Sequence, residues 1–297
     1  MMSDTRRHPR RQFASFFLPD RKDLLWTVIW IGGLAIVWVW FLLFLNEPAR
    51  LRMQTAMADT LLSAGTVVVS AFLMGWGSAM LLHLLDRPKR KRLYLAATFL
   101  LNLLRSVPQI IGMLLGYTLL AALVRGETMR SEFLQVLAAG FLTSLVVFQE
   151  VTDVIQERIR HYREMVFVSA LLVCGVPEFT IINREILWKN SVAHLVQKSG
   201  SVFGRAIFLV CSIDFIISVG LSTEVSLTNF PPTLGSMLAS LDSKQDILVI
   251  GSALTEPGLL PSLFFEHLQG IGVAFVTVFT LVCLYRISNG LVERHRL

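Results

Sequence analysis

At the centre of a polar loop over 161–199, the chain reads Ser169-Ala170-Leu171-Leu172-Val173-Cys174-Gly175 and then Ile181-Ile182-Asn183-Arg184-Glu185-Ile186-Leu187. Residues 164–174 can form a helix, and Gly175 can turn the chain because glycine adopts positive φ at no steric cost. Pro177 suits the first turn of a second helix. That helix carries a stripe compatible with one buried face, formed by Ile181, Ile182, Ile186 and Leu187. The loop therefore predicts two short helices that are joined by a glycine and presented to a partner.

Composition places the chain in a membrane. Apolar residues make up 54% of the 297 residues and charged residues 16%, with a mean hydropathy of +0.62. Soluble domains carry about 25% charged residues, and a membrane-spanning helix needs about 20 predominantly apolar residues. The stretches that meet this length are 24–45, 60–85, 93–123, 132–152, 201–221 and 268–287. We therefore predict an all-α transmembrane protein with about six membrane-spanning helices, with about five or seven as the alternatives.

Basic residues fall mainly on one side of these predicted spans. With both termini inside, twenty Lys and Arg residues lie in the terminal segments and inner loops, and five lie in the outer loops. Basic loops of membrane proteins stay in the cytoplasm. We therefore predict a multi-pass protein of the bacterial cytoplasmic (inner) membrane with cytoplasmic N- and C-termini. The net charge of +6 follows from this bias and indicates no nucleic-acid partner.

The spans divide the chain into three parts. Residues 1–23 form a basic N-terminal segment on the cytoplasmic side, and 24–59 form a first anchor span with a short outer loop. The apolar run of this anchor is longer than that of a signal peptide, which has roughly 7–15 residues. The remainder, 60–297, forms the core, with the polar loop at 161–199 and an outer loop at 222–267.

Patterns of an enzyme or of a metal site are missing from the sequence. Cys174, Cys211 and Cys283 lie far apart, and the six His residues are scattered. The stretch 200–205 contains two glycines but lacks the Lys and Ser/Thr of a phosphate-binding loop. We therefore predict no enzymatic activity and no cofactor bound by this chain. If ATP drives the protein, another chain must hydrolyse it.

The polar loop has a defined spacing. Ser169-Ala170-Leu171 stands six residues before Gly175, and Ile186-Leu187 begins eleven residues after it. This spacing resembles the EAA motif of ABC importer permeases, in which Glu-Ala-Ala precedes a Gly and Ile-Leu-Pro follows it. Ser169 and Trp188 replace the Glu and the Pro of that motif, so Glu164 or Glu178 would supply the acidic contact. The resemblance implies coupling to an ATPase subunit through Glu164, Ser169, Ala170, Leu171, Gly175, Pro177, Ile186 and Leu187.

Three further segments extend this resemblance. They are Asn102-Leu103-Leu104-Arg105-Ser106-Val107-Pro108, Pro231-Pro232-Thr233-Leu234-Gly235-Ser236-Met237-Leu238 and Ser288-Asn289-Gly290-Leu291-Val292-Glu293. The first is similar to a segment of ABC permeases that kinks at a Ser/Thr-x-Pro. The other two are similar to signatures of the second permease of dipeptide, oligopeptide and nickel importers. The resemblance implies a type I ABC importer permease fold, with a substrate-binding protein docked at Pro231, Pro232 and Gly235.

Polar residues within the predicted spans are candidates for a transport path, because such residues are unfavourable in lipid and are usually functional. Arg105 and Ser106 stand beside Pro108, which frees a backbone carbonyl. Asp214 lies near the centre of the fifth predicted span. The alternative is an interhelical contact without a role in substrate handling, in which Asp214 neutralises Arg105 or Arg205.

The resemblance implies the permease subunit of an ATP-driven importer for peptides or a related small solute. Its partners would be a homologous permease subunit, two ATPase subunits that hold ATP and Mg, and an extracytoplasmic substrate-binding protein. A permease of a methionine- or phosphonate-type importer is the alternative within the class, because residues 104–108 resemble those families as well. The rival from another class is an ion-coupled secondary transporter, for which inverted repeats and discontinuous helices are expected.

Overall fold

All regular elements in the described part of the chain are helices. The computed structural model describes residues 22–44, 47–87, 90–126, 129, 131–218, 230–239, 251–252 and 255–259, and separate positions between 275 and 290. In chain order the elements are α2 (Lys22–Phe44), α3 (Glu47–Leu85), α4 (Lys91–Ser106), α5 (Gln109–Arg125), α6 (Glu132–Arg163), α7 (Val166–Val173), α8 (Glu178–Thr180), the π-helix η3 (Ile181–Asn190), α9 (Val192–Ser218), α11 (Leu234–Ala239) and the 3₁₀ helix η4 (Pro257–Leu259).

Among the described residues, three helices are long and apolar enough to cross a membrane, namely α3, α6 and α9. The pair α4 and α5 can form a fourth span, which is bent by 90°. The apolar part of α2, Leu24–Val39, is shorter. The prediction of an all-α chain with helices fit to span a membrane is confirmed for this part of the chain. The prediction of six spans is not confirmed, because the described residues contain three such helices, or four with the bent pair.

Some predictions concern residues outside the described part. These residues are 1–21, most of the outer loop 222–267, most of the predicted span 268–287, and the C-terminal segment from 288 apart from Gly290. Two boundaries differ from the prediction. α3 begins at Glu47, so residues 47–59 of the expected outer loop are helical, and Glu47 with Pro48 suits a first helical turn. α9 begins at Val192, because the polar residues before 201 lower the hydropathy without interrupting the helix.

The third predicted span is broken at Pro108. Val107 has an extended backbone, with φ −77° and ψ 122°, because the ring of the following proline disfavours the helical region. Pro108 itself precedes α5 and cannot donate a backbone hydrogen bond. The predicted interruption at Ser106-Val107-Pro108 is therefore present, as a 90° bend between two helices.

α3 packs most extensively against α6, and both helices contact α9. Two glycines permit the approach of α3 and α6. A Cβ atom on Gly140 would lie 2.7 Å from the backbone oxygen of Ser63, and one on Gly75 would lie 2.7 Å from Cβ of Val151. Close approach matters in a membrane because lipid removes the hydrophobic drive for helix association, which leaves van der Waals contact.

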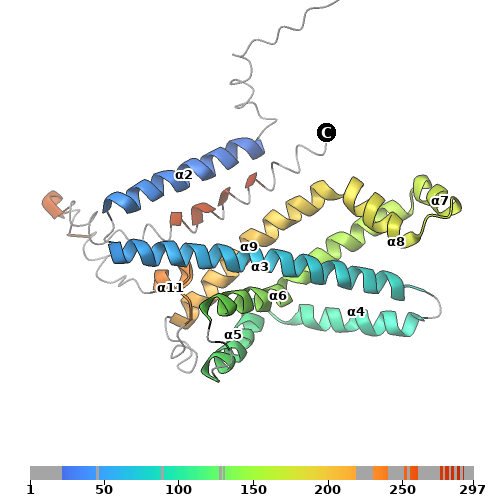
Figure 1. Ribbon diagram of the computed structural model, residues 1–297, viewed down its shortest axis with the longest axis horizontal. Helices are drawn as coiled ribbons and strands as arrows, with labels where there is room; N and C mark the ends of the chain where they lie inside the picture. Colours follow the sequence, from blue (N-terminus) through green and yellow to red (C-terminus); the bar gives the residue numbers. More distant parts are fainter. Residues whose placement is uncertain are drawn as a thin grey trace, which may run out of the picture.

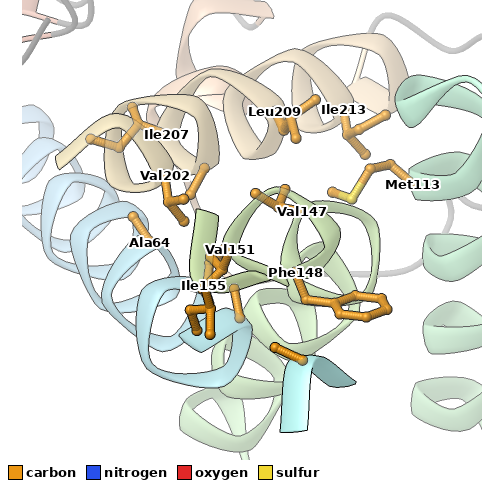
Figure 2. Close-up of a cluster of buried hydrophobic side chains, with 14 of the residues drawn as sticks. Ala64, Met113, Val147, Phe148, Val151, Ile155, Val202, Ile207, Leu209 and Ile213 are labelled. Atoms are coloured by element: carbon orange, nitrogen blue, oxygen red, sulfur yellow. The ribbon is translucent and has the colours of Figure 1, made fainter. Parts of the chain in front are cut away.

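The core forms where these helices cross. Figure 2 shows side chains of α3, α5, α6 and α9 converging, among them Ala64, Met113, Val147 and Val202. All four are essentially fully buried, with at most 2% of their surface exposed.

The helices define two ends of the molecule (Figure 1). At the first, α3 and α6 end and α4 begins, close to α7 and α8; we call it the loop end. At the other, α11 packs on α9 and on α3, and we call it the α11 end. The basic residues Arg87, Lys91, Arg160 and Arg163 belong to the loop end.

Candidate functional site

The loop over 161–199 turns at Gly175, which has a φ of +79°. The amide of Gly175 donates to the carbonyl of Leu172 at 3.0 Å, and the amide of Val176 donates to that of Leu171 at 3.1 Å. These two bonds form a Schellman motif at the end of α7, which places a residue with positive φ at the position of Gly175. The turn therefore lies at the residue that the sequence indicated.

The second helix of the loop is mostly a π-helix. Pro177 is the N-cap of α8, and its carbonyl accepts the amides of Thr180 and Ile181. In a π-helix, hydrogen bonds join residues i and i+5, so residues five apart lie on nearly the same face. This winding explains the spacing of the buried residues in η3, which are Ile181, Ile182, Ile186 and Leu187. π-helical segments are rare in proteins, and those that occur are often found at functional sites.

Trp76 of α3 holds the π-helix in place. Its Nε1 donates to Oδ1 of Asn183 at 2.8 Å, and its ring meets that of Phe179 edge to face with centroids 6.4 Å apart. The end of η3 is attached to α6, since the Tyr162 hydroxyl donates to the carbonyl of Asn190 at 3.1 Å. The loop is therefore attached to α3 and α6, two helices that are long and apolar enough to cross a membrane.

The two acidic residues considered for the ATPase contact have different surroundings. Oε1 of Glu178 lies 3.0 Å from Nε2 of His83, and its Oε2 lies 3.9 Å from Nη2 of Arg87. This carboxylate therefore ties the loop to the end of α3. Glu164 is exposed at the C-cap of α6 and is the acidic group better placed for an outside contact.

The α7 helix presents apolar residues to its surroundings. Val166 and Val173 are 84% and 89% exposed. Ser169 and Ala170 are exposed too, whereas Leu171 is half-buried. Exposed apolar patches mark sites of contact with proteins or membranes. We refer to Val166, Ser169, Ala170, Leu172 and Val173 as the tip surface.

A pocket of about 370 Å³ lies at the break between α4 and α5, against α6. Arg105 lines it, and its Nη2 lies 2.8 and 2.6 Å from the two carboxylate oxygens of Asp153. Its Nε donates to Gln149 Oε1 at 3.4 Å. Both charged side chains are more than half exposed, which is unfavourable in lipid and indicates that this side faces water or protein. Ser106 instead donates to the carbonyl of Leu103 in its own helix.

Glu150 lines the same pocket and links α6 to α9. Its carboxylate lies 2.7 Å from Nζ of Lys198 and also pairs with Nη1 of Arg205. Neither Glu150 nor Asp153 was predicted for this site from the sequence. The available signal was the spacing of Gln149, Glu150 and Asp153, which places three polar groups on one side of a helix that continues past the predicted span 132–152.

Asp214 pairs with neither arginine among the described contacts. It is 7% exposed, and its Oδ2 accepts the Thr233 hydroxyl at 2.6 Å. The Tyr117 hydroxyl bonds to the same carboxylate. Asp214 therefore joins α9 to α5 and to the segment before α11, near the α11 end. Arg105 and Asp214 lie in separate sites.

The segment around α11 is anchored to the helices. Pro231 and Pro232 are half-buried, and the amide of Leu234 donates to Thr60 Oγ1 at 3.1 Å. Gly235 is buried so tightly that an added Cβ would overlap the backbone of Cys211. Gly235 thus makes a helix–helix contact in place of the predicted docking surface. Docking stays a prediction for the two prolines.

No protein-family model matches this chain, and a search of curated proteins also found no match.

Proposed function

We propose that the chain is the permease subunit of an ABC importer for peptides or a related small solute in the bacterial inner membrane. The observation that carries the proposal is the loop at the loop end. It joins two helices at a Schellman glycine, exposes the tip surface, and is tied to helices that are long and apolar enough to cross a membrane. A loop of this build can lodge in a groove of a separate ATPase. The EAA-like spacing around Gly175 supports the same function.

In this proposal the tip surface binds one of two ATPase subunits, which hold ATP and Mg. Closure of the ATPase pair displaces the loop, and Trp76 and Glu178 pass the displacement to α3. The pocket at Arg105 faces the path, which is completed by a homologous permease subunit. A substrate-binding protein delivers the solute from outside. The chain itself performs no covalent chemistry.

Co-purification of the full chain from its native membrane tests the proposal. We expect ATPase subunits and one different permease to accompany wild type. Val173→Lys places a charge on the tip surface and is expected to abolish this association without lowering thermal stability, because Val173 is 89% exposed. Leu93→Lys is the matched control, since Leu93 is an exposed apolar residue of α4 near the same end. Two copies of this chain with the ATPases would indicate the methionine- or phosphonate-type importer.

The bend between α4 and α5 favours a second candidate. Discontinuous helices with charged groups are typical of the substrate sites of ion-coupled secondary transporters, and Arg105 lies at the bend. Under that alternative the purified chain alone would drive uptake into liposomes along an ion gradient. Absence of any ATPase, together with such uptake, would overturn the ABC proposal.

A further inference from the structure

A small polar cavity lies at the α11 end, where α3, α5, α6 and α9 meet the segment 230–233. Its volume is about 20 Å³. A cavity needs about 10–15 Å³ in this measure to hold one water molecule. The cavity can therefore hold one water molecule or one ion of similar size, and it is too small for a transported solute. Its polar lining consists of Asp59, Ser63, Tyr117, Gln135, Asp214 and Thr233.

Two of these side chains have a polar atom without a hydrogen-bond partner among the described residues. They are Oγ of Ser63 and Oε1 of Gln135. Ser63 is 2% exposed and Gln135 is 6% exposed, so bulk water does not satisfy them. Gln135 Nε2 already donates to the carbonyl of Met129 at 3.1 Å, which leaves the amide oxygen as the free acceptor. Buried polar atoms are rarely left unpaired, so these two indicate a ligand in the cavity.

The charges around the cavity are negative. Asp59 and Asp214 both line it, and Glu132 acts electrostatically on Asp59. The hydroxyl hydrogens of Thr233 and Tyr117 are already engaged by Asp214. Lys and Arg are absent from the lining residues that the structure describes. The lining is therefore rich in oxygen acceptors, and the Ser63 hydroxyl can turn its hydrogen away and offer its oxygen, which gives the oxygen ligands that a hard cation requires.

We propose that this cavity binds one monovalent cation of the size of Na⁺, with Ser63, Gln135, Asp59 and Asp214 as its oxygen ligands. Mg²⁺ keeps several water molecules when bound, and Ca²⁺ takes about 6–8 oxygens. The cavity has no room for those waters and offers fewer side chains than Ca²⁺ needs. The bound cation joins α3 and α6 to Asp214 of α9, which in turn holds Thr233 of the 230–233 segment. This proposal goes beyond the proposed function and does not rest on it.

Thermal unfolding of the full chain in lipid nanodiscs tests the site. Wild type is compared in NaCl and in N-methyl-D-glucamine chloride at equal ionic strength, and we expect a higher Tm in Na⁺ that saturates with concentration. Gln135→Leu removes one oxygen ligand and Asp59→Asn removes one negative charge, and we expect each to raise the half-saturating Na⁺ concentration at least about tenfold. Glu47→Gln removes a carboxylate from the exposed first turn of the same helix and is expected to leave it unchanged.

Equal stability of wild type in the two salts would overturn the proposal and would assign the cavity to water. The proposal also fails if N-methyl-D-glucamine, which is too large for the cavity, stabilises as well as Na⁺. Should Gln135→Leu or Asp59→Asn fail to fold, Ser63→Ala is the milder variant, because it removes only the hydroxyl. A wild-type response to Na⁺ in Ser63→Ala and in whichever ligand variant folds would place the cation elsewhere.

Discussion

At the scale of single residues, the shape of the loop depends on one backbone angle. Gly175 has a φ of +79°, and nothing lies within 4 Å of the position where a Cβ would be added. A side chain is therefore disfavoured at Gly175 by backbone conformation alone. Gly126 is a suitable comparison, since it too follows a helix but has a φ of −73°.

We expect Gly175→Ala to destabilise the turn by about 1–2 kcal/mol, because L-residues are strained in the left-handed region. Gly175→Asn should cost less, since asparagine tolerates this region. Gly126→Ala should change stability by less than about 0.5 kcal/mol. Hydrogen exchange of the amides of residues 174–176 measures the opening of the turn. An unchanged exchange rate in Gly175→Ala would contradict the Schellman assignment.

The pair of Arg105 and Asp153 gives a second prediction at this scale. Because both side chains are more than half exposed, breaking the pair with Arg105→Gln should lower stability by less than about 1 kcal/mol. Uptake of solute should nevertheless fall sharply if the guanidinium faces the path. The exchange variant, Arg105→Asp with Asp153→Arg, keeps the ion pair but moves the charges. Full uptake by the exchange variant would show that the ion pair is needed only for structure and that the position of the guanidinium does not matter for uptake.

At the scale of elements, the contact between α3 and α6 is limited by the two glycines. We expect Gly140→Ala to destabilise the protein by about 1–3 kcal/mol, since the new Cβ would press on the backbone oxygen of Ser63. Gly65→Ala in α3 has open space around its Cβ and should be neutral or stabilising by up to about 1 kcal/mol. Denaturant unfolding in mixed micelles compares the two. Equal changes in stability for Gly140→Ala and Gly65→Ala would show that α3 and α6 can move apart at Gly140 at little cost.

The π-helix depends on α3 through Trp76. Trp76→Phe keeps an aromatic ring and removes the indole N–H, so we expect the amides of η3 to exchange faster by a factor that corresponds to about 1 kcal/mol. Trp30→Phe is the matched control, because Trp30 Nε1 donates to Thr280 Oγ1 at 3.4 Å, away from the loop. Faster exchange of η3 in both variants would indicate general loosening and not the loss of one bond.

At the scale of the whole molecule, the basic helix ends and the polar loop lie at the same end. The native cysteines can test whether this end faces the cytoplasm. Cys174 is exposed, whereas Cys211 and Cys283 are buried. A membrane-impermeant maleimide should therefore label Cys174 in inverted vesicles only. Ser131→Cys, in a Cys174→Ser background, places an exposed thiol before α6 and should be labelled from the outside. Labelling of Cys174 in intact cells would reverse the predicted topology.

Local features of this fold could be predicted from the sequence. Gly175 permits a positive φ and Pro108 disfavours helical backbone at the residue before it, and the four buried residues of η3 share a face that their spacing indicates. Contacts between distant residues could not be predicted. Asp153 is 48 residues from Arg105, and only the packing of α4 against α6 makes them partners. The start of α3 at Glu47 was missed because hydropathy reports on apolar length and not on helix length.

α3 bears on both ends of the molecule. Trp76 and His83 attach it to the loop, whereas Asp59 and Ser63 belong to the cavity at the α11 end. The distance from Asp59 to His83 along the helix is about 36 Å at 1.5 Å per residue. The tight contact of Gly75 with Val151 lies between them and, under the proposed function, would be the point about which α3 tilts. A tilt of about 10° about Gly75 would then move the Asp59 end by about 4 Å and the His83 end by about 2 Å in the opposite direction. Under the proposed function α3 is a lever, through which a push at the loop would move the opposite end of the same helix.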